Sequence, residues 1–171
     1  MSSAPDGNRF APPLAHVEDV AESGPGALAS RGSRLGAAVI DVLIAMVTFG
    51  LVAWLTPINI FKPSPGSALW LMLLENTVLG FVLFLAVHGY LLADRGQTVG
   101  KMLTKIRIVR SDGSKASFGR IVGMRYLPTS VLASVPVVGG LYGLVDTLMI
   151  FRASRRCLHD VIADTIVVTA A

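Results

Sequence analysis

Two long apolar runs, residues 35–55 and 69–92, constrain this chain more than any other feature of its sequence. An α-helix rises about 1.5 Å per residue, so about 20 residues cross the roughly 30 Å hydrocarbon layer of a bilayer. The chain is 53% hydrophobic and 15% charged, whereas an average soluble domain has about 25% charged residues. We therefore predict two transmembrane helices, joined by a loop rich in proline and glycine, residues 56–67.

The first 30 residues contain four prolines and several glycines but no apolar run. Such a composition buries too little surface to offset chain entropy, and it lacks the basic start and apolar core of a signal peptide. We expect a disordered cytoplasmic tail, residues 1–30, followed by one membrane domain, residues 31–171. Ser33 is the expected N-cap of the first helix, which would run from Arg34 to about Leu55.

Basic residues concentrate in the segment that follows the second apolar run, residues 93–127. Short loops rich in lysine and arginine stay on the cytoplasmic side of a membrane, whereas the loop 56–67 has only one lysine. We therefore expect the N-terminus and the basic loop to face the cytoplasm in a multi-pass protein of a bacterial cell (inner) membrane. The basic residues of the loop are Arg95, Lys101, Lys105, Arg107, Arg110, Lys115, Arg120 and Arg125.

The third apolar region, residues 128–151, is interrupted by prolines and glycines and contains Asp146. Its length allows a full crossing, but that would place the arginines after it outside, against the charge rule. A break near Pro136 would instead give two short helices that enter the bilayer and return. We favour this re-entrant or interfacial hairpin, which leaves the C-terminal segment, residues 152–171, in the cytoplasm.

Two short segments have the pattern of β-strands. Residues 104–110 alternate between apolar and polar side chains, and residues 165–169 are rich in β-branched ones. If these strands pair, the basic loop and the C-terminus share one side of the membrane, since a strand edge would otherwise stay unpaired. The predicted fold class is an all-α membrane protein with two transmembrane helices, a third broken apolar helical region and a small cytoplasmic β element.

Asp41 lies inside the first apolar run. An ionised carboxylate in hydrocarbon costs several kcal/mol unless it is paired, protonated or facing water, so we interpret Asp41 as a functional site. Ala37 and Ala45 lie one turn before and after it, and small residues there let a neighbouring helix from this chain or another copy approach closely. His88 falls at about the same depth as Asp41. The candidate intramembrane polar partners are His88, Glu75 and Asp146.

No catalytic, cofactor-binding or metal-binding motif is recognisable in the sequence. The stretch 96–101 is not a P-loop, because three rather than four residues separate its glycines and Met102 follows the lysine. The single cysteine, Cys157, excludes an internal disulfide and a cysteine-built zinc site, and we interpret it as a packing thiol. The basic residues have little aromatic interleaving, so nucleic acid is not an expected partner. We expect no enzyme activity and no cofactor.

The chain resembles the RDD family of bacterial membrane proteins, named for one arginine and two aspartates, from Arg31 to about Thr169. The matching residues are Arg34, Asp41 and Asp160. A second recurring stretch of the family resembles residues 96–101 here, and Arg125 falls where the family usually has another arginine. The residues of this cytoplasmic motif are Gly96, Gly100, Lys101 and Arg125.

The resemblance implies an integral membrane protein, with transport of an undefined ligand often proposed. It also implies that Asp160 grips an arginine such as Arg34 or Arg125, which would tie the C-terminal segment to the first helix. The chain departs from the family at Asp164, where the family commonly has a glycine. This difference removes the basis for expecting a tight glycine turn there.

Two function classes remain open. The first is a transport-related protein for a small ion or solute, with proton coupling as an option. Two spans cannot enclose a polar path alone, so such a protein would work as a homo-oligomer. The second is a non-transporting assembly or regulatory subunit, in which intramembrane polar residues serve helix pairing. In both cases the lipid bilayer is a partner.

Overall fold

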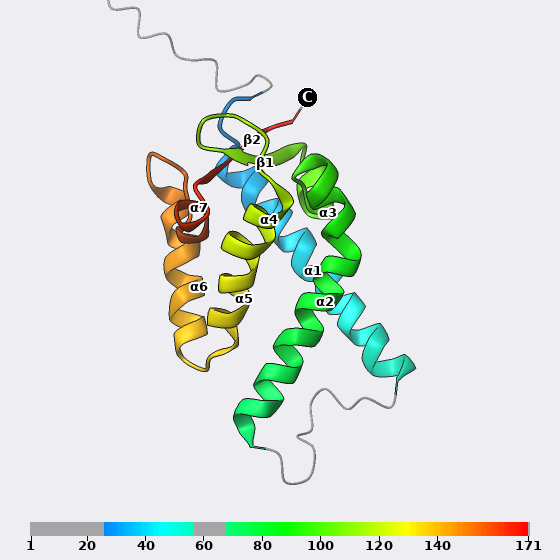
Figure 1. Ribbon diagram of the computed structural model, residues 1–171. Coiled ribbons are helices and arrows are strands. Elements are labelled where there is room, and N and C mark those ends of the chain that lie inside the picture. Colours follow the sequence, from blue (N-terminus) through cyan, green and yellow to red (C-terminus); the bar gives the residue numbers. More distant parts are fainter. Residues whose placement is uncertain (1–25, 57–67, 171) are drawn as a thin grey trace, which may run out of the picture.

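The computed structural model describes residues 26–56 and 68–170 and is mainly helical, with one small sheet (Figure 1). Helices α1 (Arg31–Leu55) and α2 (Leu69–Arg95) are long and apolar enough to cross a membrane. Their apolar side chains are largely exposed, with Trp54 80% and Trp70 63% accessible. A core helix of a soluble protein is mostly buried, so these two helices present surfaces suited to lipid.

Helix α1 begins earlier than the sequence predicted. Ser30, not Ser33, is the N-cap, and its Oγ accepts a hydrogen bond from the backbone N–H of Ser33 at 3.0 Å. Both serines suit an N-cap, so local sequence could not separate them. The earlier start adds Arg31 to the helix, and its Nε donates to the backbone oxygen of Ile150 at 3.4 Å.

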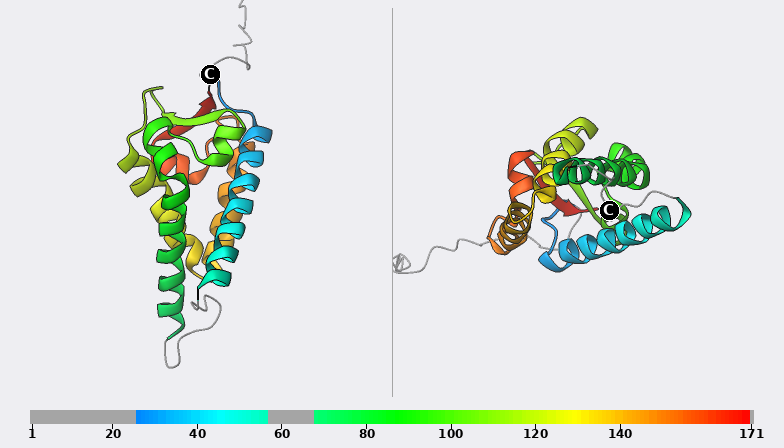
Figure 2. Two further views of the ribbon diagram at one scale, coloured as in Figure 1. Left: turned by 90° about the vertical axis from the view of Figure 1, so that its right-hand side faces the viewer. Right: turned by 90° about the horizontal axis from the view of Figure 1, so that it is seen from below.

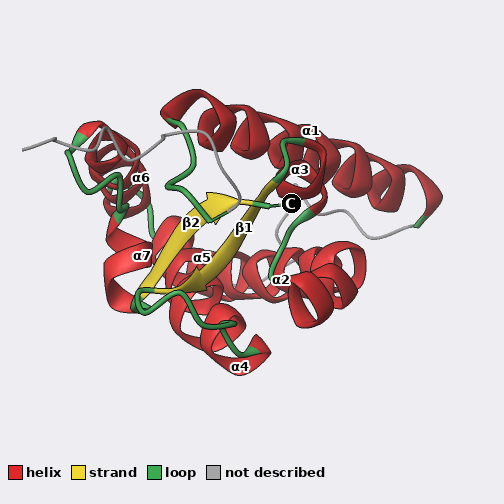
Figure 3. Cartoon of the chain, turned by 90° about the horizontal axis from the view of Figure 1, so that it is seen from above, coloured by secondary structure: helices red, strands yellow, loops and turns green. Residues whose placement is uncertain are grey.

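The remaining elements are short. Figures 2 and 3 show the sheet lying across one end of the helices, and the α5–α6 hairpin running alongside α1 and α2. We use the term cap for the sheet together with α3, α4 and α7. The segment 93–127, which was expected to be a loop with one strand, also contains α3, α4 and η1. The elements after α2 are α3 (Val99–Leu103), β1 (Ile106–Arg110), α4 (Phe118–Arg120), η1 (Ile121–Tyr126), α5 (Leu127–Ser134), α6 (Val138–Leu148), η2 (Met149–Phe151), α7 (Leu158–Ile162) and β2 (Thr165–Thr169).

Strands β1 and β2 pair in an antiparallel register that sets Ile106 opposite Thr169 and Arg110 opposite Thr165. The second strand has the predicted bounds, and the first begins two residues later than the predicted start of 104–110. Because the strands follow α3 and α7, this pairing brings the basic segment and the C-terminal segment to the same end of the molecule.

Residues 26–30, which the sequence placed in a disordered tail, instead run along the other edge of β2. Leu28 forms a bridge with Val168, and the backbone N–H of Ala29 donates to the oxygen of Val167 at 2.9 Å. Ala29 is fully buried in the core. The ordered domain therefore starts before position 31, and the rest of the predicted tail lies outside the described residues, as does most of the predicted loop 56–67.

The buried core lies in the cap and at the adjoining ends of the helices, rather than between α1 and α2. Its largest apolar members, with partly buried Phe84 and Tyr126 packed against them, come from α2, both strands and η1. Full burial of such a side chain stabilises the fold by about 1.5–3 kcal/mol. Burial of these apolar side chains therefore holds the cap against the ends of the helices. The large core residues are Leu92, Ile106, Ile108, Ile121 and Val167.

The third apolar region folds as a helical hairpin. Its first arm starts with the π-helix η1, in which the N–H of Leu127 reaches back to the oxygen of Val122. Pro128 lacks an N–H, and a wider turn next to it absorbs the missing hydrogen bond. The chain reverses between α5 and α6, where Val137 has a positive φ of 64° and the N–H of Val138 donates to the oxygen of Pro136 at 2.7 Å. The break thus falls beside Pro136.

Asp164 adopts the backbone that a glycine would provide in the turn between α7 and β2. Its φ is 50°, and its N–H donates to the oxygen of Val161 at 3.2 Å. Aspartate tolerates the left-handed region better than most residues, since its short polar side chain bonds locally. The side chain accepts a hydrogen bond from the Ser111 hydroxyl. The tight turn is therefore present without glycine.

Candidate functional site

Asp41 meets the start of helix α3. The Thr98 hydroxyl donates to Asp41 Oδ2 at 2.5 Å, and the backbone N–H of Gly100 donates to Oδ1 at 2.8 Å. The first N–H groups of a helix have no partner within it, so a carboxylate from α1 satisfies one of them here. Thr98 is also the N-cap of α3 and accepts from the N–H of Lys101.

Gly100 allows α3 to approach α1 this closely. A Cβ added at this position would lie 2.7 Å from Asp41 Oδ1 and would also collide with the backbone oxygen of Ala37, which is fully buried. Only glycine fits this contact. Of the two small residues that the sequence pointed to around Asp41, Ala37 therefore admits the short helix α3, whereas Ala45 lines the cleft between α1 and α2.

His88 lies close to Asp41 but binds a different group. Its Nδ1 accepts from the backbone N–H of Val99 at 3.2 Å, and its ring packs on Phe84 with 4.9 Å between centroids. Among the described contacts no hydrogen bond joins His88 to Asp41, although both side chains line the same cleft between α1 and α2. Both side chains bind the first turn of α3, because its free N–H groups are the nearest donors.

Glu75 lies away from this cluster. It is exposed near the start of α2, at the end of the helix opposite to the cap (Figure 1). The structure therefore does not bring it to Asp41.

Lys101 completes what we call the Asp41 site, made of Asp41, His88, Thr98, Gly100 and Lys101. Its Nζ lies 3.8 Å from Asp41 Oδ2 and 3.2 Å from the hydroxyl of Tyr126. Both charged side chains are only slightly accessible, 13% for Lys101 and 18% for Asp41. The ammonium group is close enough for attraction but makes its hydrogen bonds elsewhere, so Asp41 keeps part of its acceptor capacity.

A second cluster forms around Asp160. The carboxylate contacts the guanidinium groups of both Arg34 and Arg125, and all three side chains are nearly inaccessible. The resemblance implied that Asp160 pairs with one arginine, such as Arg34 or Arg125, and the structure shows that it contacts both. Arg34 comes from α1, Arg125 from η1 and Asp160 from α7. One carboxylate thus joins three segments that are far apart in the sequence.

Local structure positions Asp160 for this role. Cys157 is the N-cap of α7, and Asp160 three residues later accepts from the N–H of Cys157 at 3.0 Å, the reciprocal arm of a capping box. The hydroxyl of Thr165, at the start of β2, accepts from Arg125 at 2.9 Å. The hydrogen bond within its own helix therefore orients the Asp160 carboxylate toward the two arginines.

Asp146 extends this cluster through His159. Its Oδ2 lies 2.7 Å from His159 Nδ1, and its Oδ1 accepts from the His159 backbone N–H at 3.1 Å. The opposite ring nitrogen, Nε2, lies 3.0 Å from the Arg125 guanidinium, which can only donate. His159 is therefore neutral, with its proton on Nδ1. Asp146, a candidate partner of Asp41, belongs instead to this second cluster.

The electrostatics of this Asp160 network, made of Arg34, Arg125, Asp146, His159 and Asp160, follow from its contacts. Burial opposes ionisation of Asp160, but Arg125 first and then its other neighbours outweigh burial and hold its pKa well below the usual range. Burial, reinforced by Arg125, lowers the pKa of His159 in spite of its hydrogen bond to Asp146. Asp160 is therefore ionised and His159 neutral at pH 7.

Asp146, Cys157 and His159 bring three metal-ligand atoms within 4.8 Å of one another. Burial raises the pKa of the Cys157 thiol to about 11, so it is protonated at neutral pH. Arg34 lies against its sulfur and Arg125 against the imidazole. A metal ion here would face two positive charges and a protonated thiol, so the donor set does not fit a cation.

Sequence reasoning missed several of these groups. Thr98, Tyr126 and Thr165 carried no signal of their own, because a hydroxyl in a short segment is compatible with many roles. A cavity of about 120 Å³ lies between the two clusters, and residues of both line it, among them Lys101 and His159. The two clusters therefore lie next to each other at the cap end of the helices, on either side of this cavity.

Comparison with known proteins gave two matches. The sequence profile of the RDD family matches residues 28–164 of this chain. An uncharacterized protein of Bacillus subtilis (strain 168), YckC, is 32% identical over 139 residues, which cover 80% of this chain and 82% of the relative. No solved structure matches the chain.

We predict that Asp160→Asn lowers the free energy of unfolding by about 3–5 kcal/mol, because it leaves two buried guanidinium groups without a countercharge. The matched control is Asp164→Asn, since Asp164 is 47% accessible and its ion pairs with Arg120 and Arg156 are 3.9 and 3.6 Å long. That change should cost about 1 kcal/mol or less. Denaturant unfolding of the purified protein measures both, and equal losses would contradict the role of Asp160.

A second prediction concerns pH. The pKa of His159 in the folded protein lies below its ordinary value of 6.5, so as pH falls through 6.5 the unfolded chain takes up a proton that the folded chain refuses. Stability must therefore fall on acidification. We expect the loss between about pH 7.5 and pH 5.5 to be smaller in His159→Asn than in wild type. Unfolding curves at both pH values test this, and parallel losses in the two proteins would contradict it.

Proposed function

Because the chain belongs to the RDD family, we propose that it is a multi-pass protein of the bacterial cell membrane that moves a small cation, in exchange for protons, at Asp41. Family membership and the two long apolar helices indicate a membrane protein. One observation supports the ion-binding role. Asp41 lines a cleft between α1 and α2 while an ammonium group stands 3.8 Å from it.

The chemistry of the Asp41 site favours exchange. The carboxylate accepts two short hydrogen bonds, which fix it in place. Its charge is balanced by Lys101, and a small cation or a proton at the carboxylate would compete with that ammonium group. Buried carboxylates at such positions mark ion pathways in membrane proteins. The cavity beside Lys101, about 120 Å³, is lined by both charged and apolar side chains and is large enough for water that could carry a proton.

The hairpin fits a membrane position that does not cross. Each arm, residues 121–134 and residues 138–151, has 14 residues, which corresponds to about 21 Å of helix against a hydrocarbon layer of roughly 30 Å. Together with pairing of β1 and β2, this supports a re-entrant hairpin whose two ends lie on the cytoplasmic side, as the charge rule also favours.

The topology prediction follows directly. A reporter fused after Ala171 is expected to behave as cytoplasmic, and the same reporter inserted after Lys62 as external. Enzymatic reporters that are active on only one side of the membrane measure this in living cells. An external C-terminal reporter would replace the re-entrant hairpin with a third crossing.

Transport requires more than one copy of the chain. In the outer parts of α1 and α2, the described hydroxyls of Thr48 and Thr77 bond to carbonyl oxygens of their own helices. A cleft of about 540 Å³ lies open between these outer parts, lined by Phe49, Met72 and Asn76 among others. We propose that a homo-oligomer closes this cleft, since one copy provides no continuous polar path among its described residues.

The alternative is a non-transporting assembly or regulatory subunit. A specific observation favours it, because every member of the Asp160 network contacts another member and the carboxylate of Asp41 binds α3. In that case the polar residues serve only to attach the cap to the helices, and the open cleft between α1 and α2 receives a different membrane protein.

Flux through liposomes separates the two functions. Purified wild-type protein is expected to carry cation or pH flux, and Asp41→Asn to reduce it about tenfold or more, because hydrogen bonds to a charged group contribute roughly 1.5–3 kcal/mol. Asp94→Asn is the matched control, since Asp94 is 51% accessible and lies outside the Asp41 site. Wild-type protein without flux for any common cation would contradict transport. A change of oligomer distribution in Asp41→Asn would then favour the assembly role.

A further inference from the structure

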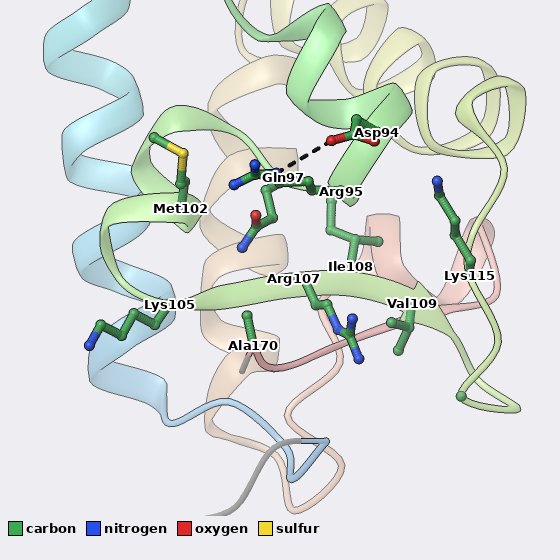
Figure 4. Close-up of a pocket in the computed structure, with 11 residues that line it drawn as sticks. Asp94, Arg95, Gln97, Met102, Lys105, Arg107, Ile108, Val109, Lys115 and Ala170 are labelled. Carbon is green, nitrogen blue, oxygen red and sulfur yellow. Dashed lines mark hydrogen bonds and ion pairs between the residues drawn. The ribbon is translucent and has the colours of Figure 1, made fainter.

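A groove of about 460 Å³ lies on the surface of the cap beside β1 (Figure 4). Its walls come from the end of α2, from α3 and from the turn that follows β1. The volume lies within the range of small-molecule sites, about 300–1,000 Å³. No member of the Asp41 site or of the Asp160 network lines it, so the groove is separate from the proposed ion pathway.

The groove is strongly basic. Figure 4 shows Lys105 and Lys115 near the two ends of β1, with Arg107 between them and Arg95 on the facing end of α2. Asp94 is the acidic residue among those that line the groove, and it already lies 3.4 Å from Arg95 Nε. A bound anion would therefore meet cationic side chains from three segments of the chain.

Three of these cations have no partner of their own. Within the described part of the chain, the side chains of Lys105, Arg107 and Lys115 make no hydrogen bond or ion pair, and all three residues are exposed. Other arginines of the cap and its surroundings are paired with aspartates near the far end of the sheet. These ion pairs are Arg110–Asp112, Arg120–Asp164 and Arg156–Asp164. The charges of Lys105, Arg107 and Lys115 are thus not neutralised by acidic side chains of the described chain.

The floor of the groove is rigid. Gly96 O accepts from the N–H of Ile108 at 2.9 Å, and Gln97 Nε2 donates to the oxygen of Ile106 at 2.8 Å. Gly96 has a left-handed backbone, and a Cβ there would lie 2.7 Å from Ile108 O. Lys105, just before the strand, is also left-handed, with φ 54°. A site built on a fixed backbone loses little entropy when it binds a ligand.

The place of the groove narrows the ligand class. It opens at the cap end of α2, and the apolar side chain of Met102 from α3, 37% accessible, lines it together with the basic residues. Basic and apolar side chains together are typical of segments at the headgroup level of a membrane. We propose that this groove binds a phosphate-bearing anion, either the headgroup of an acidic lipid or a soluble phosphate compound, through Arg95, Lys105, Arg107 and Lys115.

The test uses the purified full-length chain and two probes. Phosphatidylglycerol, with phosphatidylcholine as the neutral comparison, is followed by native mass spectrometry, and pyrophosphate by titration calorimetry. The double variant Arg107→Gln/Lys115→Gln removes two exposed, unpaired charges. It should bind whichever probe the wild type binds about tenfold more weakly or worse, since the loss of even one charge-assisted hydrogen bond lowers affinity by about that factor. Arg152→Gln, an exposed arginine outside the groove, is the matched control.

Each outcome bears on the proposal. If the double variant loses binding of phosphatidylglycerol only, the ligand is a lipid headgroup. If it loses binding of pyrophosphate only, the ligand is a soluble phosphate compound. If the unfolding temperatures of both variants equal that of the wild type, weaker binding is due to the altered groove and not to loss of folding. The proposal is overturned if wild-type protein binds neither probe, or if wild type, the double variant and Arg152→Gln bind them alike.

Discussion

The buried contact of Asp160 with Arg34 and Arg125 is the interaction on which the rest of this structure depends. Taking three charges out of water is costly, and the attraction among them offsets that cost only when geometry and hydrogen bonds are complete. Here the second positive charge is balanced by Asp146, which reaches Arg125 through a neutral His159. The network is therefore charge-balanced, and it fixes the positions of the first helix, the hairpin and the C-terminal segment together.

The two aspartates of the family motif have different environments and so different capacities. Asp160 is inaccessible and saturated by two guanidinium groups, which suits a permanent structural link. Asp41 is partly accessible, accepts from neutral donors of α3 and has its countercharge at 3.8 Å. A group of the second kind can exchange its partner with little disturbance of the fold. Of these two aspartates, Asp41 is the one whose environment suits the proposed ion exchange.

The sequence predicted what depends on long or regular patterns. The apolar runs located both long helices, and the β-branched run located β2, because these signals extend over many residues or have a fixed period. The short elements of the basic segment were missed, since helices of three to five residues carry too little pattern to detect. The contact of Asp41 with α3 and the pairing of Ala29 with β2 were missed for another reason. Both join residues far apart in sequence, and backbone N–H groups, which leave no pattern in the sequence, take part in each contact.

Both edges of the two-stranded sheet already have hydrogen-bond partners within the chain. Residues 26–30 run along β2, and Gly96 with Gln97 satisfies the exposed side of β1. An open strand would offer other molecules a ready template for extension, and in the described chain no such template is left. The described sheet therefore offers copies of this protein no open edge for strand addition. An assembly of copies through the described residues would have to use helix surfaces, where close side-chain packing decides which partner fits.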